Sequence, residues 1–354
     1  MKKGVKRIFW PAVSILAVAF LVSKIPWESF SEAIRNVNFY WVAAAIGLQM
    51  AAQTLLATRW VYLLRVHGVY ISHFQAIKLT FLGLFYNNVM PGAVGGDLLK
   101  GWFITHHSPP DKRLEAAVTV FVDRLIGLIG TIMMGAFASL FVGSEVAYRG
   151  IQIRWLPWGV FTMMAAGSLI FFSRHLRRGL FISKLLKMLP FAKQLQQIDE
   201  AIRIYRRHIT TVLWALFLTV LLQGLTIVAV WFITQGLHFE TVRLVYCLII
   251  MPIVWLIGSM IPVPGGVGII EGCITTLFCV VINPEKPGSA VGQAAALALM
   301  NRVVILYICS LPGALVPIFG GHLPRARELQ EVLEKEDPEA EIAAKNLTVK
   351  ELDK

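Results

Sequence analysis

Two apolar stretches of the sequence are each interrupted by a short segment rich in proline and glycine. The first interruption is residues 87–97 (NNVMPGAVGGD), and the second is residues 259–271 (SMIPVPGGVGIIE). Proline and glycine disfavour the interior of a helix. In lipid, the backbone groups freed by such a break must be satisfied by surrounding protein or by a water-filled cavity. Two breaks in corresponding positions of two halves indicate a binding site within a membrane protein.

The composition places these breaks in a membrane. Of the 354 residues, 56% are hydrophobic and 15% are charged, which excludes a water-soluble globular protein and indicates a polytopic membrane protein. The first apolar run lacks the small-residue cleavage site of a signal peptide, so we expect it to be a retained span. Six runs are long enough to cross a hydrocarbon core of about 30 Å, namely 8–25, 39–58, 116–142, 153–172, 211–235 and 290–318.

Positive charge is concentrated beside these runs. The net charge of +12 invites a nucleic-acid-binding interpretation, but the basic residues flank the predicted spans, as the positive-inside rule describes. We therefore expect no nucleic-acid partner and a multi-pass membrane protein with both termini in the cytoplasm. As a separate expectation, which the charge pattern does not supply, the membrane is the inner (cytoplasmic) membrane of a bacterial or archaeal cell. Recruitment of anionic lipid headgroups fits the same pattern. The main clusters are Lys2, Lys3, Lys6 and Arg7, and Arg174, Arg177, Arg178, Lys184, Lys187, Lys193, Arg203, Arg206 and Arg207.

The placement of charge also predicts a topology. If the span 39–58 ends in the cytoplasm beside Arg59 and Arg65, then residues 74–107 begin and end on the cytoplasmic side. The arm after the break is too short to cross the membrane, so this segment is predicted to be a re-entrant helical hairpin. Counting the membrane crossings further along the chain predicts that residues 244–282 form a second hairpin, which enters from the opposite side of the membrane.

The chain then divides into two membrane repeats and a tail. Repeat A covers residues 1–152, repeat B covers 153–322, and residues 323–354 form a charged cytoplasmic tail. Each repeat has three spanning helices and one hairpin broken by proline and glycine. Because the number of crossings is odd, the second repeat is inverted relative to the first. The predicted fold class is therefore an all-α polytopic integral membrane protein made of two inverted repeats.

Local sequence similarity supports the repeat. After the first hairpin, residues 116–125 read AAVTVFVDRL, and after the second, residues 294–303 read AAALALMNRV, so that Asp123-Arg124 corresponds to Asn301-Arg302. Gln49 and Gln223 also lie at comparable distances before their hairpins, although two glutamines can coincide by chance.

Five charged residues fall inside apolar segments and are candidates for a binding site. A charge at the centre of a membrane helix costs about 2.5–3.5 kcal/mol on insertion scales, so each one requires a reason. One interpretation is that the arginines pair with the carboxylates and lock the bundle. The other is that the arginines face a cavity and hold a phosphate group. The two interpretations are compatible, because an arriving phosphate can displace a carboxylate. The residues are Asp97, Asp123, Arg124, Glu271 and Arg302.

The hairpin turns add a second candidate feature for anion binding. A glycine turn before a helix presents unpaired N–H groups and the positive end of the helix dipole. Asp97 and Glu271 either cap these helices, recognise a cationic headgroup or take up a coupling proton. We therefore include Asn301 and the turn glycines among the predicted substrate-binding residues, and the glycines are Gly95, Gly96, Gly265, Gly266 and Gly268.

No residue pattern predicts catalysis. The sequence contains no nucleotide-binding P-loop, no Ser-His-Asp arrangement, no paired catalytic carboxylates and no soluble catalytic domain. We expect no metal and no cofactor, and the four cysteines lie in apolar segments without CxxC spacing and are expected to be reduced. The protein is therefore not expected to be an enzyme.

The same segments resemble a known family. Residues 88–97, residues 123–127 (DRLIG), residues 264–271 and residues 302–307 (RVVILY) are similar to the flippase-like family that includes the transmembrane region of bacterial lysylphosphatidylglycerol synthases, the multiple peptide resistance factors. The resemblance extends from about residue 10 to residue 318. It implies a domain that moves a phospholipid, or assists its movement, between leaflets. The family also includes members associated with hopanoid and glycan-lipid pathways, so it leaves the lipid open. We expect no aminoacyl-transferase domain like that of the full-length synthases, so this chain is not expected to make lysyl-lipid alone.

The sequence thus predicts lipid translocation, with a membrane phospholipid or related anionic lipid as the partner. An alternative is a non-transporting membrane scaffold for a lipid-modifying enzyme, a lipid- or glycosyl-transferase, that docks on the basic loop 173–210. A third interpretation, a membrane transferase with its active site at the hairpins, would require turnover by the purified protein. The oligomeric state stays open.

Overall fold

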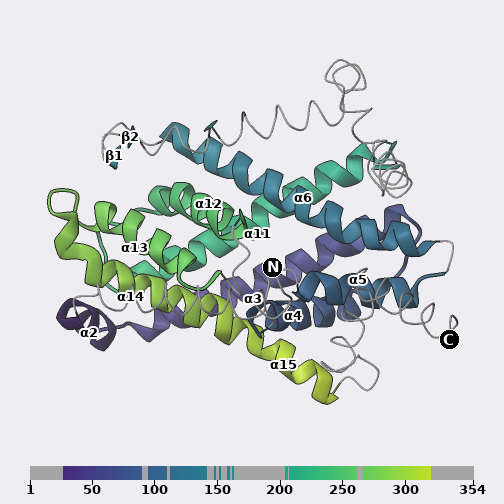
Figure 1. Cartoon of the computed structure of the whole chain (residues 1–354), viewed down its shortest axis with the longest axis horizontal. Helices are drawn as coiled ribbons and strands as arrows, with labels where there is room; N and C mark the ends of the chain where they lie inside the picture. Colours follow the sequence, from purple (N-terminus) through teal and green to yellow (C-terminus); the bar gives the residue numbers. More distant parts are fainter. Residues whose placement is uncertain are drawn as a thin grey trace, which may run out of the picture.

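The computed structural model describes residues 27–89, 95–109, 112–141, 207–260 and 266–319, together with 147–148, 151–152, 158–159, 162 and 204–205. These residues are almost entirely helical (Figure 1). The first half contains α2 (Trp27–Arg35), α3 (Phe39–Val66), α4 (His73–Val89), α5 (Gly95–His107), α6 (Arg113–Ala138) and the 3₁₀ turn η2 (Ser139–Phe141). Two-residue strands, β1 (Ala147–Tyr148) and β2 (Ile151–Gln152), form a small antiparallel pair.

The second half repeats the order of long and short helices. It contains α11 (Ile209–Gly236), α12 (Leu244–Met260), α13 (Ile269–Ile282), the 3₁₀ turn η5 (Pro287–Ala290), α14 (Val291–Asn301), the π-helix η6 (Arg302–Ile308) and α15 (Cys309–Phe319). The breaks between α4 and α5 and between α12 and α13 fall at the proline and glycine segments.

Four helical segments are long and apolar enough to cross a membrane, and they are 39–66, 115–141, 209–236 and 287–316. They confirm four of the six predicted spans as apolar helices. The predicted runs 8–25 and 153–172, the loop 173–210 and the tail 323–354 lie wholly or almost wholly outside the described residues. Exposed aromatic residues stand at both ends of α3, as is usual at membrane interfaces, namely Phe39 and Tyr40 at its start and Tyr70 and Phe74 after its end.

The predicted end of the second span at residue 58 is wrong. α3 continues for two more turns, and Arg59 is buried within the helix bundle instead of flanking the end of the helix. An arginine is tolerated there because Asp123 of α6 pairs with it. The charge therefore marks an internal contact of the helix and not its end.

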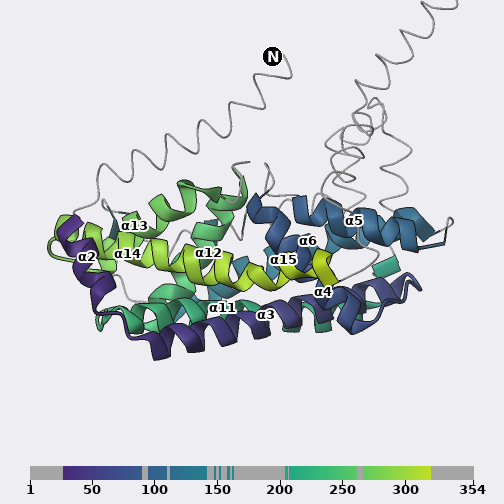
Figure 2. The ribbon, with the colours of Figure 1, turned by 90° about the horizontal axis from the view of Figure 1, so that it is seen from below.

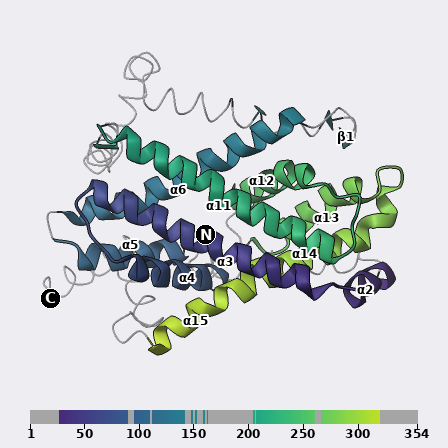
Figure 3. The ribbon, with the colours of Figure 1, turned by 180° about the vertical axis from the view of Figure 1, so that it is seen from behind.

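The two 28-residue helices α3 and α11 lie antiparallel along one face of the molecule (Figures 2 and 3). The Asn38 N–H before α3 donates to the Gly236 carbonyl at the end of α11 (2.9 Å). At the other end the Tyr205 hydroxyl, before α11, donates to the Leu63 carbonyl of α3 (3.2 Å). Burial raises the pKa of Tyr205 above its ordinary value, so this hydroxyl keeps its proton.

The remaining helices cross between the halves in a reciprocal way. α6 packs on α12 of the second half, and α15 packs on α4 of the first half. α5 and α13, the helices that follow the two breaks, lie at opposite ends of the molecule (Figure 1). Apolar residues form one large core around α11 to α14 and a second core between α3, α4 and α5. A cavity lined by apolar residues and by a set of charged and polar side chains lies between helices of the two halves.

Candidate functional site

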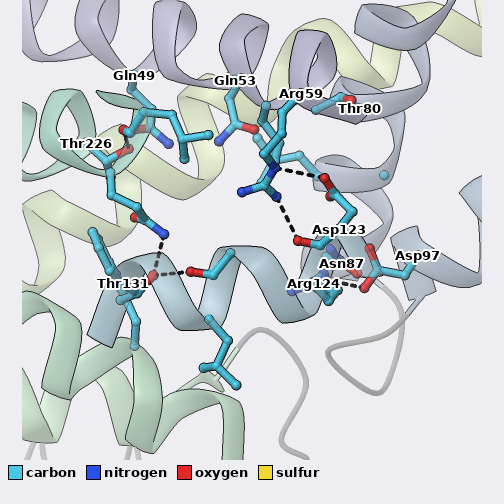
Figure 4. A pocket seen from close by; sticks show the side chains of 18 of the residues that line it. Gln49, Gln53, Arg59, Thr80, Asn87, Asp97, Asp123, Arg124, Thr131 and Thr226 are labelled. Carbon is cyan, nitrogen blue, oxygen red and sulfur yellow. Dashed lines mark hydrogen bonds and ion pairs between the residues drawn. The ribbon is translucent and has the colours of Figure 1, made fainter. Parts of the chain in front are cut away.

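Helices of both halves enclose a cavity of about 540 Å³ (Figure 4). α3, α4, α5 and α6 form most of its wall, and α11, α12 and η6 complete it. Its volume is in the range of sites that hold small molecules, about 300–1,000 Å³. Most of its polar residues come from α3, α5, α6 and α11.

Arg59 is the centre of the charged end of this cavity. Its Nε donates to Asp123 Oδ1 (2.8 Å), and a terminal nitrogen donates to the Asp123 carbonyl (3.0 Å). Its other terminal nitrogen donates to the Thr219 hydroxyl of α11 (2.8 Å). One guanidinium group therefore holds α3, α6 and α11 together around a buried, hydrogen-bonded ion pair.

A glycine of α6 makes the contact between Arg59 and Thr219 sterically accessible. A Cβ at Gly130 would lie 2.4 Å from the Thr219 Cγ2, so only glycine lets α6 approach α11 this closely. At Gly127 a Cβ would meet both terminal nitrogens of Arg59 at 3.5 Å. The approach of α6 to α11 therefore requires a glycine at residue 130, just after the DRLIG segment, whereas the 3.5 Å at Gly127 is an ordinary van der Waals distance.

A second ion pair lies where the cavity meets the surface. Arg124 Nε is 2.5 Å from Asp97 Oδ2, and the Arg124 side chain is 56% exposed. Asp97 stands in the first turn of α5, beside Gly96, whose N–H donates to Asn87 Oδ1 of α4 (2.7 Å). The predicted residues Asp97, Asp123 and Arg124 all line one cavity, and among the described residues Asn87 is the acceptor for the first turn of α5.

The third ion pair joins Glu271 to Arg302 and does not line the cavity. Glu271 Oε1 accepts from Arg302 Nε, while its Oε2 accepts from the Gly268 N–H (2.7 Å) and so caps α13. The Arg302 side chain is only 7% exposed. Arg302 begins the π-helix, an irregularity that is common near functional sites.

The remaining predicted residues are the turn glycines and Asn301. Gly95 begins α5, and Gly266 and Gly268 adopt left-handed backbone conformations before α13 (φ 62° and 85°). Gly265 lies outside the described residues. Asn301 is buried at the end of α14 and, like Gly266 and Gly268, it does not line the cavity.

Lys100 is a cavity residue that the sequence analysis missed. It lies one turn after Asp97 on the same side of α5, and its side chain is buried in the cavity wall, with 6% of the residue exposed. Its Nζ lies 5.1 Å from the ring centroid of Trp60. Among the residues that the structure describes, Lys100 forms no ion pair. The sequence did contain a signal for this residue. Lys100 follows Asp97 by three residues in a short apolar segment, so the two side chains are expected on the same side of a helix.

The opposite end of the cavity carries amides and hydroxyls. Gln223 Nε2 of α11 donates to Thr131 Oγ1 of α6 (2.7 Å), and the Thr131 hydroxyl donates to the Gly127 carbonyl (2.8 Å). Gln49, Gln53 and Thr226 complete this end (Figure 4). Within the described part of the chain, no group of three or more His, Cys, Asp or Glu side chains could hold a metal ion.

Comparison with known proteins gives a consistent match over nearly the whole chain. Residues 8–313 match the profile of a family described as the lysylphosphatidylglycerol synthase TM region. A UPF0104 membrane protein of Pyrococcus horikoshii is 23% identical over 327 residues, which cover 85% of this chain and 94% of the relative. A UPF0104 membrane protein of Methanocaldococcus jannaschii is also 23% identical, over 321 residues that cover 85% of this chain and 91% of the relative.

Proposed function

This chain belongs to the family of the lysylphosphatidylglycerol synthase transmembrane region, and from that premise we propose that it translocates a phosphate-bearing lipid headgroup between the leaflets of the cytoplasmic membrane. The lipid headgroup enters the cavity, and its acyl chains remain in the bilayer, so the protein needs to shield only the polar part.

The observation that carries this proposal is the excess of positive charge in the cavity. Three cationic side chains line it, Arg59, Lys100 and Arg124, against two carboxylates, Asp97 and Asp123. Each carboxylate is paired with an arginine, so the formal excess charge of +1 belongs to Lys100. A phosphodiester carries one negative charge and matches this excess. An unbalanced cation is costly in an apolar bundle unless an anion joins it.

We further propose that the two halves are inverted repeats. α3 and α11 have equal lengths and run antiparallel, and both are followed by a residue with positive φ, Gly68 and His238. Counted from the start of each helix, Gln53 and Gln223 occupy the same position, so Gln53, and not Gln49, is the counterpart of Gln223. The reciprocal packing of α6 on α12 and of α15 on α4 agrees with a two-fold relation.

The repeat relation makes Asp97–Arg124 and Glu271–Arg302 equivalent gates. Each joins a carboxylate in the first turn of a hairpin helix to an arginine of the following long helical segment. The first pair is exposed at the cavity and the second is buried. Such a difference is expected of a carrier that is open on one side and closed on the other.

The proposal is tested with the purified full chain in liposomes that contain phosphatidylglycerol labelled on an acyl chain. The measurement is the time course with which the inner-leaflet label becomes accessible to an impermeant quencher. We expect transport by the wild type, a loss of about tenfold or more in Lys100→Met, and an unchanged rate in the control Lys78→Met. Lys78 is on α4 outside the cavity, where its Nζ lies 4.4 Å from the Phe74 ring centroid.

Two results would contradict the proposal. If wild-type liposomes exchanged lipid no faster than protein-free liposomes, the protein would not be a translocator of this lipid. If Lys100→Met transported at the wild-type rate with equal protein incorporation, the excess cation would have no part in binding the headgroup.

A further inference from the structure

The cavity is chemically divided along its length (Figure 4). Its charged end contains the Arg59–Asp123 and Arg124–Asp97 pairs and Lys100. The other end, which we call the amide end, is formed by Gln49, Gln53, Thr131, Gln223 and Thr226. All five residues are uncharged, and each presents an amide or a hydroxyl group.

One buried atom of the amide end lacks a partner. The Gln49 residue is 4% exposed, and its Oε1 accepts no hydrogen bond from any described residue. Thr80 Oγ1, in the cavity wall near Arg59, is likewise buried and unpaired within the described residues. A buried polar atom without a hydrogen bond is costly, so both atoms indicate a ligand that can hydrogen-bond to them.

Three other residues of the amide end, Gln223, Thr131 and Thr226, are held in position by hydrogen bonds. Gln223 and Thr131 are fixed by the chain of hydrogen bonds that ends on the Gly127 carbonyl. The Thr226 hydroxyl donates to the Leu222 carbonyl (3.0 Å), and its oxygen can still accept a hydrogen bond. These groups form a preorganised surface for a hydrogen-bonding ligand, which reduces the cost of ordering them on binding.

We propose that the amide end binds an uncharged, hydroxyl-bearing headgroup substituent, of the glycerol or sugar type, while the lipid phosphate occupies the charged end. This inference rests on the proposed function for the phosphate and adds the class of substrate. A hydroxyl both donates and accepts, so it can pair with the amides and the threonine oxygens alike.

An amine-bearing headgroup fits this arrangement poorly. In an apolar surrounding an ammonium group is stabilised best by an unpaired carboxylate, and it cannot pair with the amide N–H groups because it has no acceptor. The two carboxylates that line the cavity, Asp97 and Asp123, lie at the charged end and are already paired with arginines. The amide end offers an ammonium group no negative charge.

The test measures binding of soluble short-chain lipids to the full chain in detergent. Dihexanoyl phosphatidylglycerol is compared with dihexanoyl phosphatidylpropanol, which has the same charge without hydroxyls, and with dihexanoyl phosphatidylethanolamine. The variants are Gln49→Leu, Lys100→Met and the control Gln293→Leu, since Gln293 of α14 does not line the cavity. Titration calorimetry or thermal stabilisation gives the dissociation constants.

We expect phosphatidylglycerol to bind about tenfold tighter than phosphatidylpropanol and tighter than phosphatidylethanolamine. Gln49→Leu should reduce the preference over phosphatidylpropanol several-fold, and Gln293→Leu should preserve it. Lys100→Met should weaken the binding of both anionic lipids by the same factor and keep the ratio of their dissociation constants.

The inference is overturned if the two anionic lipids bind equally, if phosphatidylethanolamine binds tightest, if neither anionic lipid binds, or if Gln49→Leu keeps the full preference. Selective binding without transport in liposomes would refute the translocation proposal alone.

Discussion

Arg59 connects three helices through a single side chain. Its guanidinium group contacts the Asp123 carboxylate and carbonyl on α6 and the Thr219 hydroxyl on α11, and all three residues are buried. Removing one partner of a buried ion pair leaves the other charge uncompensated, whereas replacing both by apolar residues costs much less. The protein is therefore expected to lose more stability when one of the two charges is removed than when both are replaced by apolar residues.

A double-mutant cycle tests the junction. We expect Arg59→Met and Asp123→Leu each to destabilise the protein by about 3–5 kcal/mol, and the double variant to lose clearly less than the sum of the two. Reversible unfolding in mixed micelles measures the free energies of unfolding. Additive losses would show that the two residues do not interact, and small losses in both single variants would show that the pair carries little of the stability.

At the level of elements, close helix crossings hold the first hairpin in place. α4 and α5 cross where a Cβ at Gly96 would lie 2.1 Å from the Gly83 carbonyl oxygen. On its other side, α4 is crossed by α15, where a Cβ at Gly313 would lie 2.0 Å from the Phe81 carbonyl oxygen. Small residues at such crossings allow backbones to approach, and packing of this kind drives helix association in membranes. The crossing also sets the distance of Asp97 and Lys100 from α6.

The crossing is tested by adding one methyl group. Gly96→Ala should force α4 and α5 apart and destabilise the protein by about 1–3 kcal/mol, because the Cβ meets rigid backbone. Gly101→Ala is the matched control on the same helix, where nothing lies within 4 Å of the added Cβ. It should be neutral or stabilise by about 0.5–1 kcal/mol, since alanine favours the helix. Thermal unfolding of the detergent-solubilised variants compares them, and equal midpoints would argue against a tight crossing.

For the whole molecule, the proposed relation between the halves predicts coupling between distant sites. In a carrier with two gates, opening the buried Glu271–Arg302 pair favours closure of the cavity near Arg124. The carboxylate of Glu271 also caps α13, so its neutralisation weakens both the ion pair and the start of the helix. The effect can reach the first half through η6, which begins at Arg302 and contacts α3 and α4.

Thiol labelling measures this coupling. In a variant whose native cysteines are replaced, Leu128→Cys introduces a reporter in the cavity wall. We expect Glu271→Gln to slow labelling of this cysteine several-fold by shifting the population toward the opposite conformation. The control Glu285→Gln changes an exposed carboxylate in the turn between α13 and α14 and should leave the rate unchanged. A labelling rate independent of residue 271 would contradict alternating gates.

The sequence by itself determined the local features of this protein. Long apolar runs predicted the four spans that the structure describes, and the proline and glycine segments predicted the breaks after α4 and α12, because chain composition controls both properties locally. The cost of a membrane-buried charge marked Asp97, Asp123, Arg124, Glu271 and Arg302 as residues that need partners.

Only the tertiary structure decided which partners meet. Arg59 looked like the end of a span, yet it pairs with Asp123, and Lys100 looked like one more basic residue, yet it lines the cavity. Glu271 and Arg302 meet each other away from that cavity. These contacts join residues far apart in the chain, so they depend on how helices cross. Helix crossings are set by small residues and packing between elements, which the hydrophobic pattern of one segment does not contain.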